Sequence, residues 1–215
     1  MDGQKARSAA PEETAGGGPA SSRRGDRDLR EAIRHHAAAL FAERGYAATS
    51  MRDIAEAASC TKPALYYHFD SKQALFVDVL RTEIERLTSV IGDAVQQPTS
   101  TRERMTRAAR DYLDQVRRHP VGLKLVMRAE MHPERDQPAF DFQSTRAQIM
   151  DQVTEMLTEG MKAGEIRADL DVPVFIDAVG GALDNRAMLF VLAGEPIPDD
   201  YPERMLDTLF RGLAP

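Results

Sequence analysis

Apolar residues recur every three or four positions along most of this chain, and that spacing limits the folds open to it. The first such stretch contains Leu29, Ile33, Ala37, Leu40 and Phe41. This spacing places apolar side chains on one face of an amphipathic helix. We find neither the alternating pattern of a strand nor an internal repeat, so the sequence predicts an all-α protein. Later helices are predicted at residues 101 to 118, 121 to 131, 139 to 163, 172 to 193 and 202 to 213.

Size and composition indicate one or two globular domains. The chain has 215 residues, of which 42% are apolar and 29% charged. Cys60 is the single cysteine and cannot form an internal disulfide. No export signal is recognisable, and no apolar run, including residues 188 to 193, is long enough to span a membrane. We therefore expect a cytoplasmic protein.

Charge is distributed unevenly along the chain. The net charge is −6, yet residues 1 to 80 contain equal numbers of acidic and basic side chains. The whole acidic excess lies in the later part, which indicates two regions with different roles. A neutral average does not exclude nucleic-acid binding, because a few cations on one face are sufficient.

The first 27 residues are predicted to be a disordered arm. They are rich in Gly, Ala, Ser and Pro and contain no large apolar residue, so they cannot offset the entropy lost on ordering.

Three short helices follow the arm. Gly45 ends the first helix, and Ser50 with Asp53 has the capping-box spacing that opens a second helix of about two turns. Thr61 caps a third helix, over residues 62 to 69, with a proline in its first turn. A fourth helix begins at about Ser71 and ends near residue 98. The tight turn between the second and third helices is typical of a helix-turn-helix.

The third helix has an unusually polar outer side for its length. Leu65 and Phe69 face inward, four residues apart. A bundle-core helix rarely presents so many donors, although a helical hairpin with a polar exposed face is the alternative interpretation. The outward donors are Lys62, Tyr66, Tyr67 and His68.

These residues resemble the DNA-binding domain of the TetR family of transcriptional regulators. The resemblance covers about residues 29 to 80 and is nearly unbroken. One departure is the turn from Ala58 to Cys60, where the family usually has Gly then Val, so Ser59 has to accept the glycine conformation. The matching segments are Phe41 to Tyr46, Thr49 to Ala55, Leu65 to Phe69, and Ser71-Lys72 with Leu75-Phe76.

The resemblance implies that residues 28 to 75 form a DNA-binding domain. Family members dimerise and place one recognition helix per subunit into successive major grooves of a palindromic operator. Thr49 and Ser50 match positions that cap the second helix and touch phosphate, and Arg52 one that reaches a base edge. The implied DNA-binding residues are Thr49, Ser50, Arg52, Thr61, Lys62, Pro63, Ala64, Tyr66, Tyr67, His68 and Lys72.

The resemblance further implies that residues 76 to 215 form a larger helical domain for ligand binding and dimerisation. An apolar or aromatic ligand suits the candidate pocket residues, although each is also a candidate for plain core. They are Tyr112, Val116, Leu125, Met127, Phe140, Phe142, Met150, Asn185 and Met188. Residues 172 to 193 form either one half of a dimer interface with the last helix or, as the alternative, an internal core helix. The interface candidates are Phe175, Val179, Gly180, Leu183, Phe190, Met205 and Leu209.

The predicted function is a ligand-responsive regulator that represses from a palindromic operator and is released by a small molecule. An activator, or a helical dimer that acts through protein partners, is the alternative. We find no nucleophile elbow, phosphate loop, dinucleotide fingerprint or zinc-protease helix, so no enzyme, cofactor or metal is predicted. Cys60 next to the recognition helix is a candidate redox sensor, but a buried thiol there would be inert.

Overall fold

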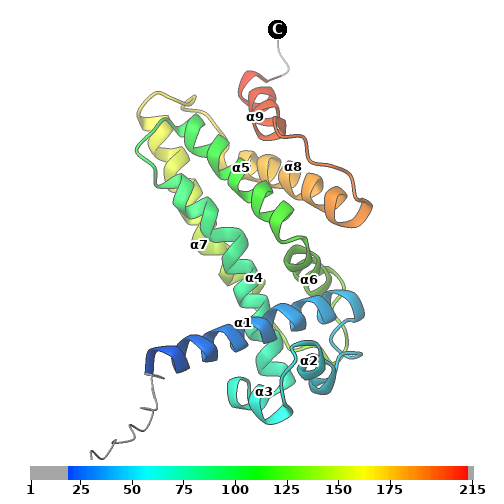
Figure 1. Ribbon diagram of the computed structural model, residues 1–215. Helices are drawn as coiled ribbons and strands as arrows, with labels where there is room; N and C mark the ends of the chain where they lie inside the picture. The colour runs from blue at the N-terminus through cyan, green and yellow to red at the C-terminus, as the bar shows by residue number, and fades with distance from the viewer. Residues whose placement is uncertain (1–18, 213–215) are drawn as a thin grey trace, which may run out of the picture.

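The computed structural model describes residues 19–212, and that part of the chain is folded into nine helices without a strand (Figure 1). The all-α prediction is confirmed for this range. The helices are α1 (Pro19–Arg44), α2 (Met51–Ala57), α3 (Lys62–His68), α4 (Lys72–Val95), α5 (Thr101–Arg118), α6 (Pro120–Met131), α7 (Phe142–Lys162), α8 (Val172–Ala193) and α9 (Tyr201–Arg211). None of the helices described here is long and apolar enough to cross a membrane.

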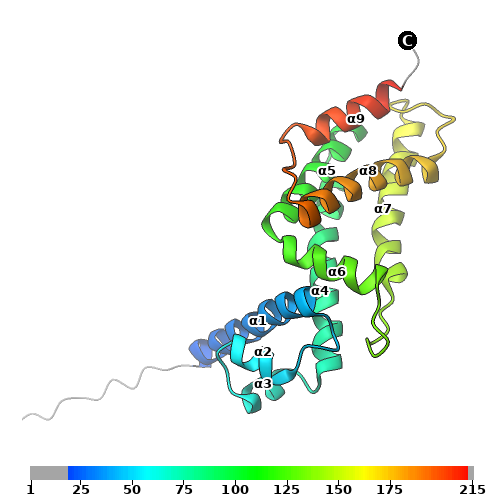
Figure 2. The ribbon, with the colours of Figure 1, turned by 90° about the vertical axis from the view of Figure 1, so that its right-hand side faces the viewer.

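The molecule has two units, joined by the long helix α4. The N-terminal unit consists of α1 to α3 and the first half of α4, packed around fully buried side chains such as Phe41, Ile54 and Leu65. The C-terminal unit consists of α5 to α9 and the second half of α4, around Leu113 and Leu157. Figure 2 shows α4 running from one unit into the other, so a tilt of this helix moves both.

Side-chain caps begin α2, α3 and α4 at the residues that the sequence predicts. The Ser50 hydroxyl accepts from the Asp53 amide, and the Asp53 side chain accepts from the Ser50 amide, which completes the capping box of α2. Thr61 caps α3, with proline in the first turn, and Ser71 caps α4. Gly45 ends α1 at φ +89°, a conformation that glycine adopts without strain.

The structure corrects the predicted start of α1. Residues 19 to 27, assigned to a disordered arm, are helical and continuous with the rest of α1. Once the apolar stretch from Leu29 has nucleated a helix, each added residue gains a hydrogen bond at little cost, and Pro19 lies at the terminus where its missing N–H does no harm. Residues 1 to 18 lie outside the described part.

Other helix boundaries differ by one to three residues. The helix predicted from residue 139 begins at Phe142, because the Asp141 side chain accepts from the Ser144 amide at 3.0 Å and caps it there. The last helix ends at Arg211, and Leu213, the predicted end, lies outside the described residues.

Ser59 takes a left-handed conformation, as the departure from the family pattern predicts. Its φ is +52°, in the turn between α2 and α3. A non-glycine residue in this conformation is strained by about 1 to 2 kcal/mol. Glycine would remove the strain, but it would also lose more conformational entropy on folding, which offsets part of the gain.

We expect Ser59→Gly to raise the free energy of unfolding by about 0.5 to 1 kcal/mol, because it removes this strain. Ser59→Ala keeps a Cβ atom and therefore the backbone strain, so it should change the free energy of unfolding little. Urea unfolding of both variants at one protein concentration checks the prediction, and equal stabilities for the two would contradict it.

Candidate functional site

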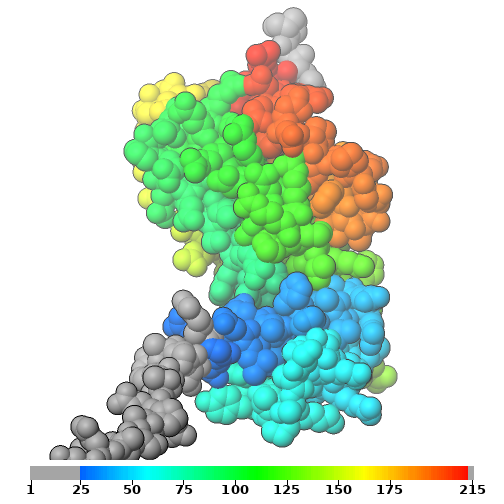
Figure 3. All heavy atoms as spheres, viewed as in Figure 1, coloured from blue at the N-terminus to red at the C-terminus, as the bar shows by residue number. Residues whose placement is uncertain are grey.

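Helix α3 presents an exposed surface of polar and aromatic side chains at one end of the molecule. Tyr67 is 78% exposed and Tyr66 47%, unusual for large aromatic residues. Lys62 and Pro63 at the start of α3 are exposed as well. Figure 3 shows α2 and α3 forming the end of the N-terminal unit farthest from the C-terminal unit. This face offers donors and ring surfaces to a partner outside the chain.

The start of α2 lies beside this face and adds further exposed groups. Ser50 and Arg52 are both exposed, as is Thr61, the N-cap of α3. Hydrogen bonds from the hydroxyl and the amide of Ser50 hold the pKa of Asp53 below its ordinary value, so this carboxylate stays ionised at the N-terminus of α2.

Three of the predicted contact residues hold the N-terminal unit together instead of lying free on its surface. Thr49 is buried, and its hydroxyl donates to the Gly45 carbonyl at 2.8 Å, so its side chain is not exposed for the predicted phosphate contact. Lys72 Nζ donates to the carbonyls of Tyr46 at 2.9 Å and Thr49 at 3.0 Å. The His68 side chain is only 6% exposed, with Nε2 3.6 Å from Asp26 Oδ1.

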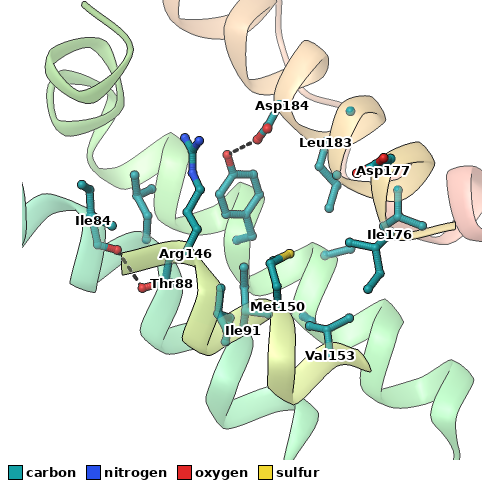
Figure 4. Close-up of a pocket in the computed structure, with 18 of the residues that line it drawn as sticks. Ile84, Thr88, Ile91, Arg146, Met150, Val153, Ile176, Asp177, Leu183 and Asp184 are labelled. Carbon is teal, nitrogen blue, oxygen red and sulfur yellow. Dashed lines mark hydrogen bonds between the residues drawn. The ribbon is translucent and has the colours of Figure 1, made fainter. Parts of the chain in front are cut away.

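The C-terminal unit contains a cavity of about 690 Å³ between α4, α5, α6, α7 and α8. Its wall is mostly aliphatic and methionine side chains (Figure 4). The exposed residues Met131 and Met150 lie at its α6 and α7 edge. Such a volume is within the range of sites for drug-sized ligands. The labelled apolar residues in the close-up are Ile84, Ile91, Met150, Val153, Ile176 and Leu183.

A few polar groups interrupt the apolar wall. The Tyr112 hydroxyl donates to Asp184 Oδ1 at 2.8 Å. Burial and the Asp184 carboxylate raise the pKa of Tyr112, so its phenol stays neutral. Arg146 of α7 donates to both carboxylate oxygens of Glu130 of α6 at 2.7 Å each, which joins these helices beside the cavity. Asp177 also lines the wall, so the cavity wall contains more carboxylates than cationic side chains.

The structure brings five of the nine candidate pocket residues to the cavity: Tyr112, Met127, Met150, Asn185 and Met188. The other four lie elsewhere. Val116 is buried in the core of the C-terminal unit, and Leu125 belongs to the core of the N-terminal unit. Phe140 and Phe142 pack against that same core, with ring centroids 4.8 Å apart. Residue spacing alone does not distinguish the core side of a helix from its cavity side. The sequence did not indicate Arg146, Glu130 and Asp184 as cavity residues, because a charged position on a helix usually faces water.

Four residues predicted for the dimer interface also line the cavity, namely Phe175, Val179, Gly180 and Leu183. Phe190 and Met205 pack against the core of the C-terminal unit, and Leu209 is half-buried on α9. The apolar stripe on α8 that suggested an interface therefore faces its own subunit.

Family models match both units. One described as "Bacterial regulatory proteins, tetR family" covers residues 33–79, and one described as "Tetracyclin repressor-like, C-terminal domain" covers residues 98–213, more than half of the chain. The chain belongs to the TetR family of transcriptional regulators. It is a DNA-binding regulator of transcription, and its family consists of regulators, not enzymes.

Among TetR proteins, the chain is similar to the transcriptional repressor KstR2 of Mycolicibacterium smegmatis, with 32% identity over 144 residues, 66% of this chain and 70% of that protein. It is also similar to the transcriptional activator FasR of the same organism, with 34% identity over 109 residues, 49% of this chain and 50% of that protein. The structure of the regulator FadR from Bacillus subtilis in complex with stearoyl-CoA has a TM-score of 0.68, with 18% identity over 86% of this chain and 99% of that one.

Proposed function

We propose that this TetR protein is a cytoplasmic homodimeric repressor that binds a palindromic operator and is released by an apolar effector in the cavity. The observation that carries the proposal is the exposed face of α3, which the rest of the described chain leaves uncovered. We expect Lys62, Pro63 and Ala64 at its start to meet base edges, and the exposed Tyr66 and Tyr67 to contact the sugar-phosphate backbone.

The free face of α8 supports a dimer. One set of its exposed positions is spaced by three, four or seven residues, as in a helix-pairing seam, and most of these positions have apolar or small side chains open to a partner. Val174 and Leu192 at the two ends are 61% and 62% exposed. The seam consists of Val174, Ala178, Gly181, Asn185 and Leu192, of which Gly181 and Asn185 also border the cavity.

The cavity supports an effector that is largely apolar. Its wall is dominated by aliphatic and methionine side chains, and the solved FadR complex holds a long acyl chain as stearoyl-CoA. Helix α4 contributes to the cavity and to the N-terminal unit, so an occupant that tilts α4 changes the distance between the two α3 helices of a dimer. Operator binding requires a spacing of about 34 to 36 Å, one turn of DNA. Effector and operator therefore oppose each other.

Selection from random DNA duplexes at low salt tests the proposal. We expect an inverted repeat to be enriched and stearoyl-CoA, used as the first apolar probe, to lower operator affinity at least tenfold. Enrichment of no inverted repeat would favour a dimer that acts through protein partners. A reporter gene behind the selected operator should be expressed more strongly when this protein is deleted. Weaker expression would identify an activator, as FasR is.

A further inference from the structure

A carboxylate of the C-terminal unit holds the backbone that leads into α2. Glu134 lies in the connection between α6 and α7, which Figure 2 shows descending beside the N-terminal unit. Its Oε1 accepts from the Tyr46 amide at 3.0 Å and its Oε2 from the Ala47 amide at 2.8 Å. The two oxygens thus bind successive amides of the link between α1 and α2.

Arg128, near the end of α6, completes this contact. Its Nη2 lies 3.3 Å from Glu134 Oε1, and the guanidinium also reaches the carbonyls of Glu43 and Arg44 at the end of α1. Burial opposes ionisation of Glu134, but the Ala47 and Tyr46 amides and Arg128 outweigh it and lower the pKa of this carboxyl. The carboxylate is therefore charged at neutral pH, and its bonds to the amides are charge-assisted. We call Glu134, Arg128 and these backbone partners the Glu134 clamp.

The link held by the clamp is also supported by packing of the Tyr46 ring on Phe76, with ring centroids 4.9 Å apart, and by hydrogen bonds to its carbonyls. Lys72 Nζ binds the carbonyls of Tyr46 and Thr49, and the Thr49 hydroxyl binds the Gly45 carbonyl. These bonds satisfy acceptors, whereas Glu134 satisfies the donors of Tyr46 and Ala47. Loss of the carboxylate therefore leaves two amides of the link without their acceptor. Ser50 and Arg52 follow directly, so the link sets where α2 and its exposed groups lie.

Helix α6 connects the clamp with the cavity. Met127, Glu130 and Met131 line the cavity, and Arg128 lies between them in sequence but faces α1. The connection after α6 is tied to it, because Gln137 Nε2 donates to the Ala129 carbonyl at 2.8 Å. A displacement of the last turn of α6 therefore carries Glu134 with it.

We propose that Glu134 is a positioning residue for DNA recognition, through which the C-terminal unit holds α2 and α3 in the arrangement that binds the operator. This inference rests on the proposed function, since it assumes that these helices contact DNA. It assigns a part of operator binding to a residue outside the helix-turn-helix, in the connection between the two cavity-lining helices α6 and α7.

Glu134→Gln tests this role because charge and positioning predict opposite results. The substitution keeps the size of the side chain and removes a negative charge, which by itself strengthens binding to DNA. The glutamine carbonyl can still accept from one of the two amides, Tyr46 or Ala47, but its NH2 group cannot accept from the other. One bond is therefore lost and the other is no longer charge-assisted, so we expect operator affinity to fall about tenfold. The matched control is Glu159→Gln on α7, an exposed glutamate 3.8 Å from Arg104 and outside the clamp, which should bind as well as the wild type or slightly better.

Hydrogen exchange separates positioning from a general loss of stability. In Glu134→Gln we expect at least one of the two amides, Tyr46 or Ala47, to exchange at least tenfold faster, with exchange in the buried part of α4 unchanged. Faster exchange throughout α1 and α4 would indicate a merely structural role and would overturn the inference, as would operator affinity equal to or above that of the control. If the wild type selects no operator, the proposed function fails. If it does and Glu134→Gln binds equally well, only this inference fails.

Discussion

The variant Ala178→Glu is expected to be monomeric and to bind the operator about 10² to 10⁴ times more weakly than the wild type, because it loses the second linked contact with DNA. Ala178 is exposed on α8 within the proposed seam and does not line the cavity. The exchange of alanine for glutamate keeps a strong helix former, so the protomer should remain folded. In a dimer, however, the two-fold axis would bury both carboxylates against apolar surface without a cation.

Sedimentation and operator titration of Ala178→Glu should be compared with Thr154→Glu, which adds the same charge at an exposed position of α7. The control should remain dimeric, and its operator affinity should fall only by the small amount that one added negative charge explains. A dimeric Ala178→Glu with wild-type affinity would place the subunit interface elsewhere.

The N-terminal unit could be predicted in detail because its signals are local. The capping box of Ser50 and Asp53, the Thr61 cap and the glycine that ends α1 each act within four residues, and the structure confirms all of them. The left-handed conformation of Ser59 could be predicted because it too is a local feature, set at the turn position where the family usually has glycine.

The roles of individual polar residues were harder to predict because they depend on distant partners. Thr49 and Lys72 are residue types that commonly contact DNA phosphates. In this structure, however, their polar side-chain atoms bind backbone carbonyls of the link before α2. Glu134 lies 88 residues from Tyr46 in sequence, and no local pattern indicates that the two meet. The same limit applies to α8, where one apolar stripe lines the cavity and the neighbouring stripe, with the same periodicity, is exposed.

A pair of glycine substitutions should measure how much the clamp contributes to folding. Gly45 and Gly164 both have positive φ, at +89° and +75°, so alanine at either position costs about 1 to 2 kcal/mol of backbone strain. At Gly164 an added Cβ meets no atom within 4 Å. At Gly45 it would lie 1.9 Å from Glu134 Oε1 and 2.5 Å from Arg128 Nη2.

We therefore expect Gly45→Ala to lower the free energy of unfolding by about 3 kcal/mol or more, against about 1 kcal/mol for Gly164→Ala. The excess arises because both side chains have to leave, which breaks the bonds to the Tyr46 and Ala47 amides. In a Glu134→Ala background those bonds are already absent and Arg128 can move aside, so the cost of Gly45→Ala should fall close to that of Gly164→Ala. Urea unfolding of the single and double variants at one protein concentration gives the coupling energy. Equal costs of Gly45→Ala in the two backgrounds would mean that Glu134 does not restrain the link.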